Sequence, residues 1–210
     1  MRTGSQDMTS INARRASPRT RATPGTVAET IPYAWPWDGV VDLDALAVLT
    51  VRAPGPLPDG PWRTHLDALV EAAHRNGVRV IEVITHPPGA DPVGDSGLPA
   101  DGDLVVRAQG WSGFFGSPLD ATLNRLALTH LVLAGHWLEI GVHSTMRAAN
   151  DRGYECLLAA DACASFDPLL RPSALSSIEM SGGIFGAVGA SPAIIDALNG
   201  TTAPAPTTGD

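Results

Sequence analysis

The chain alternates short apolar runs with longer stretches whose apolar positions recur every three to four residues. The apolar runs are of strand length and are rich in Val, Leu, Ile and Ala, and the longer stretches have the periodicity of amphipathic helices. We predict strands over 45–51, 78–84, 104–106, 130–134, 154–160 and 183–189. We predict helices over 61–77, from Ser117 onward, between Gly135 and Gly153, over 166–180 and from Ser191 onward. Strands that alternate with helices and are apolar almost throughout indicate a parallel sheet covered on both faces. The expected fold is therefore a three-layer α/β domain with a doubly wound, six-stranded parallel sheet.

Length and charge set the outline of the domain. A chain of 210 residues fits one domain with tails. We expect a flexible basic tail over 1–32, the α/β domain over 33–199 and a second flexible tail over 200–210. The first 25 residues hold five arginines and one aspartate, and they lack the apolar stretch of a secretory signal.

Several partners and locations are disfavoured by composition. The net charge of −8 argues against binding to nucleic acid, whose phosphates require a basic face. No apolar run approaches the roughly 20 residues that a membrane helix needs, so we expect a cytoplasmic protein without membrane contact.

Common cofactors are disfavoured as well. The chain has no lysine, which excludes a P-loop, and the string TVRAPGPLPDG after the first strand lacks the glycine pattern of a dinucleotide site. His86 follows the second strand but has no nearby Asp-x-His partner, so we expect no metal site. We expect no cofactor either. Cys156 and Cys163 are expected to be reduced and buried, with a catalytic role for Cys163 as the alternative.

Five strings together identify a family resemblance. They are ALAVLTVR (45–52), WSGFFGSPLDATL (111–123), LVLAGHWLEIGVHSTMRAANDRGYE (131–155), AADACASFDP (159–168) and GGIFGAVGAS (182–191). In this order they resemble the isochorismatase-like hydrolase superfamily over roughly 43–199, and their details are most similar to amidohydrolases of ureido and carbamoyl compounds. The resemblance implies the same six-stranded fold, a small-molecule ligand and a homodimer or homotetramer.

The resemblance also implies three catalytic positions, and the chain departs from the family at each. The aspartate that closes the first strand as proton carrier is replaced by Thr50. The lysine position aligns with Ala108, next to Arg107, and the nucleophilic cysteine position holds Gly141. True isochorismatases also have glycine there and protonate an enol ether instead, but they keep the aspartate.

Other polar and aromatic side chains near these positions are candidates for the site. His136 and Glu139 are the catalytic candidates, because an imidazole titrates near neutral pH and a carboxylate at a helix start can exchange protons. The alternatives are a histidine satisfied by its surroundings and a glutamate that caps the helix. The candidates for substrate binding are Arg107, Trp111, Phe115, Trp137, Thr50 and Gly141. For Trp137 the alternative is ordinary packing, and for Arg107 it is a surface ion pair.

Two functions follow from this pattern. One is an enzyme that acts on a small polar molecule by acid–base chemistry without a cysteine. The other is a catalytically silent relative that binds a ligand or a partner subunit.

Overall fold

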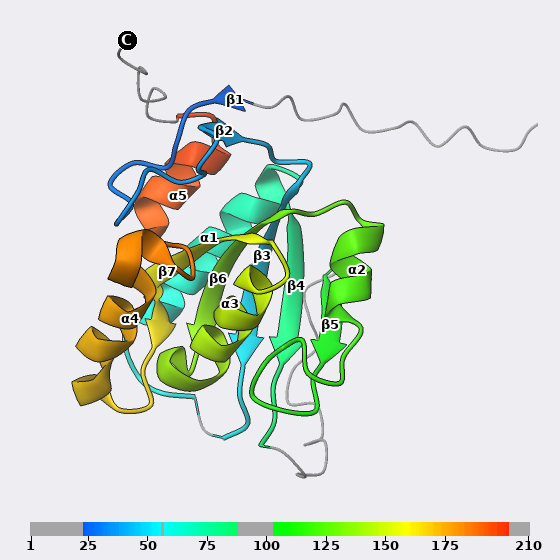
Figure 1. The fold of residues 1–210 in the computed structure, drawn as a ribbon, viewed down its shortest axis with the longest axis vertical. Coiled ribbons are helices and arrows are strands. Elements are labelled where there is room, and N and C mark those ends of the chain that lie inside the picture. Colours follow the sequence, from blue (N-terminus) through cyan, green and yellow to red (C-terminus); the bar gives the residue numbers. More distant parts are fainter. Residues whose placement is uncertain (1–22, 56, 88–102, 202–210) are drawn as a thin grey trace, which may run out of the picture.

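The computed structural model describes residues 23–55, 57–87 and 103–201 and contains the predicted parallel sheet. Six strands lie in the order β5-β4-β3-β6-β7-β8, and every neighbouring pair is parallel (Figure 1). The strands are β3 (Leu46–Arg52), β4 (Arg79–Ile84), β5 (Leu104–Arg107), β6 (His130–His136), β7 (Glu155–Ala164) and β8 (Ala187–Gly189). The predicted fold class is confirmed.

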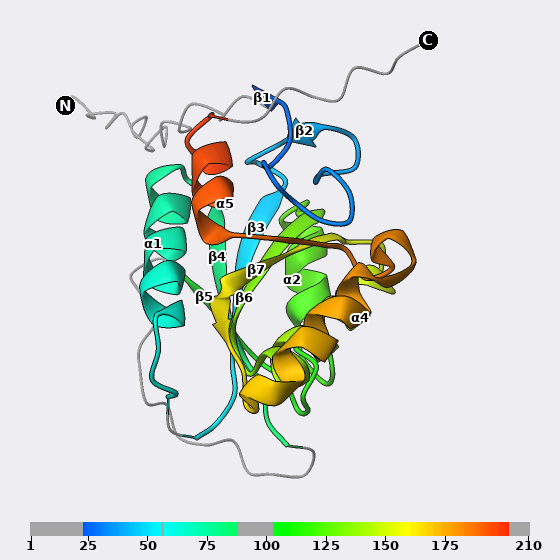
Figure 2. The same ribbon diagram turned by 90° about the vertical axis from the view of Figure 1, so that its left-hand side faces the viewer.

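Helices cover both faces of the sheet (Figure 2). On one face α1 (Trp62–Arg75) and α5 (Ser191–Leu198) pack against the strands. On the other face lie α2 (Leu119–Arg125), α3 (His143–Asn150) and α4 (Arg171–Gly183). Each helix has one apolar side to bury, so the sheet acquires a hydrophobic core on each face.

The segment before the first core strand is packed onto the domain. A short antiparallel pair joins β1 (Thr23–Pro24) to β2 (Val40–Val41). Val27 and Trp35 are almost fully buried, and Ile31 forms a bridge to Val188 at the sheet edge. Residues before 33 are thus already part of the folded structure, whereas composition alone predicted that the domain starts at residue 33. The polar and proline-rich sequence gave no sign of this packing, because the burial depends on contacts with distant strands.

Two elements near the C-terminus differ in length from their predicted bounds. β7 continues to Ala164, and its register with β6 shifts between Leu133 and Gly135. α4 continues to Gly183 with a kink, since Ser181 and Gly182 adopt positive φ angles. The last strand is therefore shorter than predicted.

The order of the strands changes direction between β3 and β6. From β3, the strands β4 and β5 are added on one side of the sheet, and β6, β7 and β8 are then added on the other side. In open α/β sheets, ligands bind at the carboxyl ends of the strands beside such a switch point. None of the helices in the described segments is both long and apolar enough to cross a membrane.

Candidate functional site

The switch point places a sharp corner between β6 and α3. β6 ends at His136, the His136–Trp137 peptide bond is cis, and a π-helical turn, η1 (Leu138–Val142), leads into α3. The N–H of Val142 donates to the Trp137 carbonyl at 3.1 Å, which closes the wide turn. This corner carries Gly141, the position at which the family resemblance implies a nucleophile.

Gly141 is buried in a space that leaves little room for a side chain. A Cβ atom on Gly141 would lie 3.0 Å from Thr85 Oγ1 and 3.3 Å from Val51 Cγ1. The Trp111 carbonyl oxygen would lie 3.7 Å away. Both of the first two distances are shorter than ordinary van der Waals contact, so neighbouring atoms would have to shift for any residue larger than glycine.

The loop after β5 is held against this corner. The Gly113 N–H donates to Thr145 Oγ1 of α3 at 2.9 Å. A Cβ on Gly113 would lie only 2.5 Å from Val83 Cγ1, so the close approach of the loop to β4 requires glycine. Trp111 is half-buried in this loop, whereas Phe115 is 61% exposed. The two substrate-binding candidates of this loop therefore differ in exposure, and the backbone carbonyl of Trp111 lies near Gly141.

His86, two residues beyond the end of β4, is the most unusual polar side chain at this edge. The residue is 3% exposed, and its backbone N–H donates to the Gly110 carbonyl at 3.1 Å. Both ring nitrogens are shielded from solvent and have no hydrogen-bond partner among the residues that the structure describes. A buried donor or acceptor left unpaired costs about 1–3 kcal/mol, so such groups are rare in native proteins. The sequence drew attention to His86 only as a possible metal ligand.

His136 lies on the other side of the corner and is bound to the protein itself. Its Nε2 is 3.2 Å from the Ala53 carbonyl oxygen, so this nitrogen carries the proton and donates. The ring is 3% exposed and meets Trp62 and Trp137 edge-to-face, with centroids 5.5 and 5.6 Å away. Burial lowers the pKa of His136, and the positive charges of neighbouring arginines lower it further. The imidazole is therefore neutral around pH 7.

Glu139 is held by the loop that follows β7. Its two carboxylate oxygens accept the N–H groups of Phe166 at 2.9 Å and Asp167 at 3.2 Å. Trp137 meets the exposed Phe166 ring edge-to-face at 5.3 Å. Glu139 and Trp137 thus both connect the corner to the start of α4.

The remaining predicted residues lie at different strands. Pairing aligns Arg107 with Ile84, Ile84 with Arg52, and Arg52 with His136 at one level of the sheet. Arg107 and His136 are thus three strand spacings apart, about 14 Å between backbones. Arg107 is exposed, and Arg52 forms an ion pair with Glu82 at 2.8 Å.

The side chain of Thr50 lies on the opposite face of the sheet from Gly141. Side chains alternate along β3, and Val48 faces the α1 side whereas Val51 faces the α3 side. The alternation places Thr50 with Val48, away from the surroundings of Gly141. The structure therefore brings Gly141, Trp111 and Thr85 together, and it separates them from Thr50.

Neither cysteine lies in a reactive setting. Cys163 is 3% exposed, and its thiol donates to the Ala159 carbonyl at 3.3 Å. Burial raises the pKa of Cys163 to about 12, and burial also raises the pKa of Cys156. Across the described segments, no cluster of three or more His, Cys, Asp or Glu side chains could hold a metal ion.

Comparison with known proteins now assigns the family. The model of the isochorismatase domain matches residues 63–189, more than half of the chain.

The chain belongs to the isochorismatase family.

Curated relatives agree over shorter segments. The uncharacterized isochorismatase family protein YwoC of Bacillus subtilis is 41% identical over 66 residues, which are 31% of this chain and 35% of that protein. Ureidoacrylate amidohydrolase RutB of Methylobacterium radiotolerans is 37% identical over 86 residues, 40% of this chain and 33% of that protein. The matched segment thus spans about a third of the length of these relatives.

Solved structures show the same fold. A cysteine hydrolase from Pseudomonas syringae pv. phaseolicola superposes with a TM-score of 0.65 at 17% identity, covering 77% of this chain and 95% of that one. The nicotinamidase SaPncA from Staphylococcus aureus gives 0.58 at 19% identity, with 69% and 98% covered. At these identities the likeness concerns architecture alone.

Proposed function

We propose that this member of the isochorismatase-like hydrolase superfamily is a small-molecule enzyme that works without a cysteine nucleophile. The position that the resemblance assigns to the nucleophile holds Gly141, and its surroundings crowd even a Cβ atom. Both cysteines are buried and their thiol pKa values are raised, so the thiolate needed for nucleophilic attack is scarce.

The observation that carries the proposal is the unpaired imidazole of His86. It follows Thr85, which forms one wall around Gly141, and it is buried at the edge where α/β sheets bind ligands. An imidazole with an unused donor and an unused acceptor can both bind a polar ligand and transfer a proton. We assign acid–base chemistry to His86 rather than to His136 or Glu139, because His136 Nε2 and both carboxylate oxygens of Glu139 already bind backbone groups.

A carboxylate-bearing ureido compound is the substrate class that fits best. Arg107 ends the strand beside β4, and its backbone pairs with Ile84, two residues before His86. Its guanidinium would bind the carboxylate, Trp111 would form a wall, and His86 would reach the ureido group. The similarity to ureidoacrylate amidohydrolase RutB supports this choice.

The second candidate is a silent relative that binds a ligand without turnover. It is favoured by the hydrogen bonds of His136 and Glu139, which give both residues a purely structural use. The two candidates differ in whether bound ligand is converted.

The test measures ammonia release by the full chain from ureidoacrylate, N-carbamoyl-β-alanine and nicotinamide, before and after treatment with iodoacetamide. We expect turnover of a ureido acid that resists alkylation and falls by about 10²–10⁴-fold in His86→Gln. His74→Gln is the matched control, because His74 pairs with Asp103 at the far end of α1. Turnover that iodoacetamide abolishes would contradict the proposed mechanism. Quenching of tryptophan fluorescence by the ureido acid without any ammonia release would instead establish the silent relative.

A further inference from the structure

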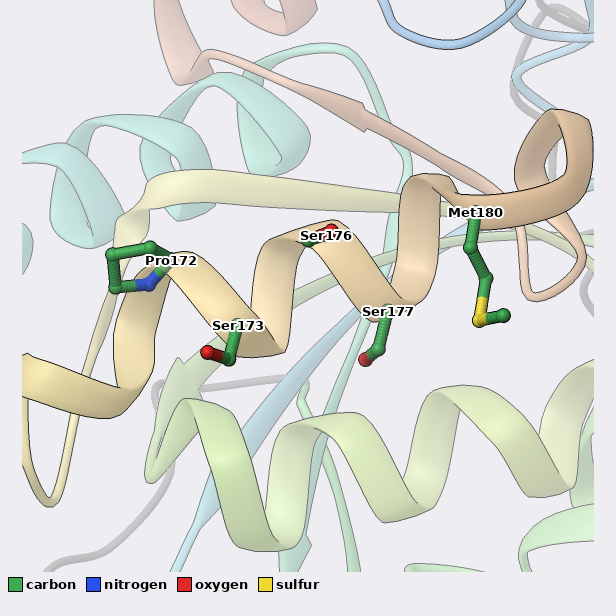
Figure 3. Close-up of a pocket in the computed structure, with 5 residues that line it drawn as sticks. All are labelled: Pro172, Ser173, Ser176, Ser177 and Met180. Carbon is green, nitrogen blue, oxygen red and sulfur yellow. The ribbon is translucent and has the colours of Figure 1, made fainter.

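A serine and a histidine from different helices meet beside a hollow in the surface of α4. The hollow has a volume of about 530 Å³, and its lining comprises Pro172, Ser173, Ser176, Ser177 and Met180. Ser177 is half-buried and points toward α3, whereas Ser176 is exposed and points to another side of the helix (Figure 3). The Ser177 hydroxyl is thus reached both from the hollow and from the neighbouring helix.

The neighbour of Ser177 on α3 is His143, the first residue of that helix. Ser177 Oγ lies 3.4 Å from His143 Nε2, and it also lies 2.9 Å from the Ala174 carbonyl oxygen. The hydroxyl hydrogen can point to either acceptor, since it rotates about the Cβ–Oγ bond. A nucleophile and its base are typically about 2.6–3.2 Å apart and are often farther apart before a substrate binds. The observed distance fits such a pair without its substrate.

The imidazole of His143 is held in place by an aromatic neighbour. Its ring meets Phe185 edge-to-face with centroids 5.9 Å apart, and the Arg147 guanidinium lies 4.3 Å from the centroid of the same Phe185 ring. Burial lowers the pKa of His143, and the positive charge of Arg147 lowers it further. The imidazole is therefore neutral at pH 7. In the tautomer with its hydrogen on Nδ1, Nε2 can take the proton of the serine hydroxyl.

We propose that Ser177 and His143 form a second catalytic site, independent of turnover at His86, which cleaves small activated esters through an acyl-serine. Ser177 Oγ attacks the carbonyl carbon while its proton moves to His143 Nε2, and the bond from that carbon to the alcohol oxygen breaks. The leaving oxygen takes the proton from the imidazole. Water then attacks the acyl-serine by the same route, which releases the acid and restores the hydroxyl. A neutral ester suits the hollow, because serine, proline and methionine side chains line it.

The test is hydrolysis of 4-nitrophenyl acetate by the full chain at pH 7.5, with the acetylated residue mapped by mass spectrometry after an acid quench. The chain has no lysine, so the side-chain amines that such esters commonly modify are absent. We expect acetyl on Ser177, and we expect turnover to fall at least about tenfold in Ser177→Ala and in His143→Gln. Ser176→Ala is the matched control, because it removes a hydroxyl from the same hollow, and it should hydrolyse the ester as fast as wild type.

Three outcomes would overturn the proposal. They are the absence of acetyl on Ser177 in the wild-type chain, equal turnover by Ser177→Ala and Ser176→Ala, and acetylation of Ser177 at the wild-type rate in His143→Gln. The mapping in the wild-type chain requires no variant to fold, and circular dichroism checks the folding of each variant.

Discussion

Thr85 Oγ1 stands 3.0 Å from the point that a Cβ atom on Gly141 would occupy. Val51 Cγ1 lies 3.3 Å away on another side, so the corner before α3 is filled by neighbours from β3 and from the residue after β4. The space around residue 141 is therefore tight, and a side chain there would have to displace its neighbours slightly.

We expect Gly141→Ala to destabilise the protein. In a helical turn this change normally stabilises by about 0.4–1 kcal/mol, because it restricts the unfolded chain. Overpacking a tight site costs about 1–3 kcal/mol, and we expect this larger effect to win. Urea unfolding measures the difference, and a Thr85→Ala background should reduce it. A Gly141→Cys variant as stable as wild type, with thiol-dependent turnover, would contradict the crowding.

Removal of the Glu139 carboxylate should loosen the loop after β7. Glu139→Ala loses two charge-assisted hydrogen bonds to Phe166 and Asp167, and we expect a loss of about 1.5–3 kcal/mol. Glu139→Gln keeps one acceptor and should lose less. The control is Glu71→Ala on the exposed side of α1, which should stay within about 0.5 kcal/mol of wild type. Equal stability of Glu139→Ala and Glu71→Ala would show that these bonds contribute nothing.

Stability should decline with falling pH because His136 is buried and His143 is half-buried, which favours the neutral form of both. Burial lowers the pKa of His136 and His143 from the ordinary value of 6.5. Below that value the unfolded chain binds protons that the folded chain does not, so the free energy of unfolding rises with pH in this window. We therefore expect less stability at pH 5.5 than at pH 7.5.

The double variant His136→Phe/His143→Phe should flatten this dependence in urea unfolding series. Comparison with wild type cancels the opposite contribution of Glu155, whose pKa is raised by burial. An unchanged slope in the double variant would assign the pH dependence to other groups.

The two thiols should be unreactive in the native protein. Since burial raises the pKa of Cys163 to about 12 and also raises that of Cys156, little thiolate exists at pH 8. We expect a thiol reagent such as DTNB to label neither cysteine rapidly in buffer and both in urea. One fast-reacting thiol in the folded protein, mapped by mass spectrometry, would refute this.

Sequence pattern predicted the sheet because each core strand is apolar almost throughout, a local property that needs no knowledge of contacts. The same holds for the corner at Gly141, which lies where an apolar run changes to helical periodicity. The role of Glu139 could not be predicted, since its partners Phe166 and Asp167 come from a distant loop. Nor could the isolation of His86, because a missing hydrogen bond depends on every neighbour in space. The packing of Val27 against the sheet escaped prediction for the same reason.

The central position of β3 beside β6 has a consequence for synthesis on the ribosome. Leu46 pairs with His130, so β3 can pair with β6 only after a much later part of the chain has been synthesised. The strands β4 and β5, in contrast, follow β3 directly in the sequence. Such distant pairings form slowly, because the intervening chain must first be brought into place. A nascent chain that ends at Thr129 contains β3, β4 and β5 together with Thr85 and His86. It does not yet contain the corner at Gly141. The candidate site comes into existence only when the second half of the chain docks, so any ligand that needs both halves also holds them together.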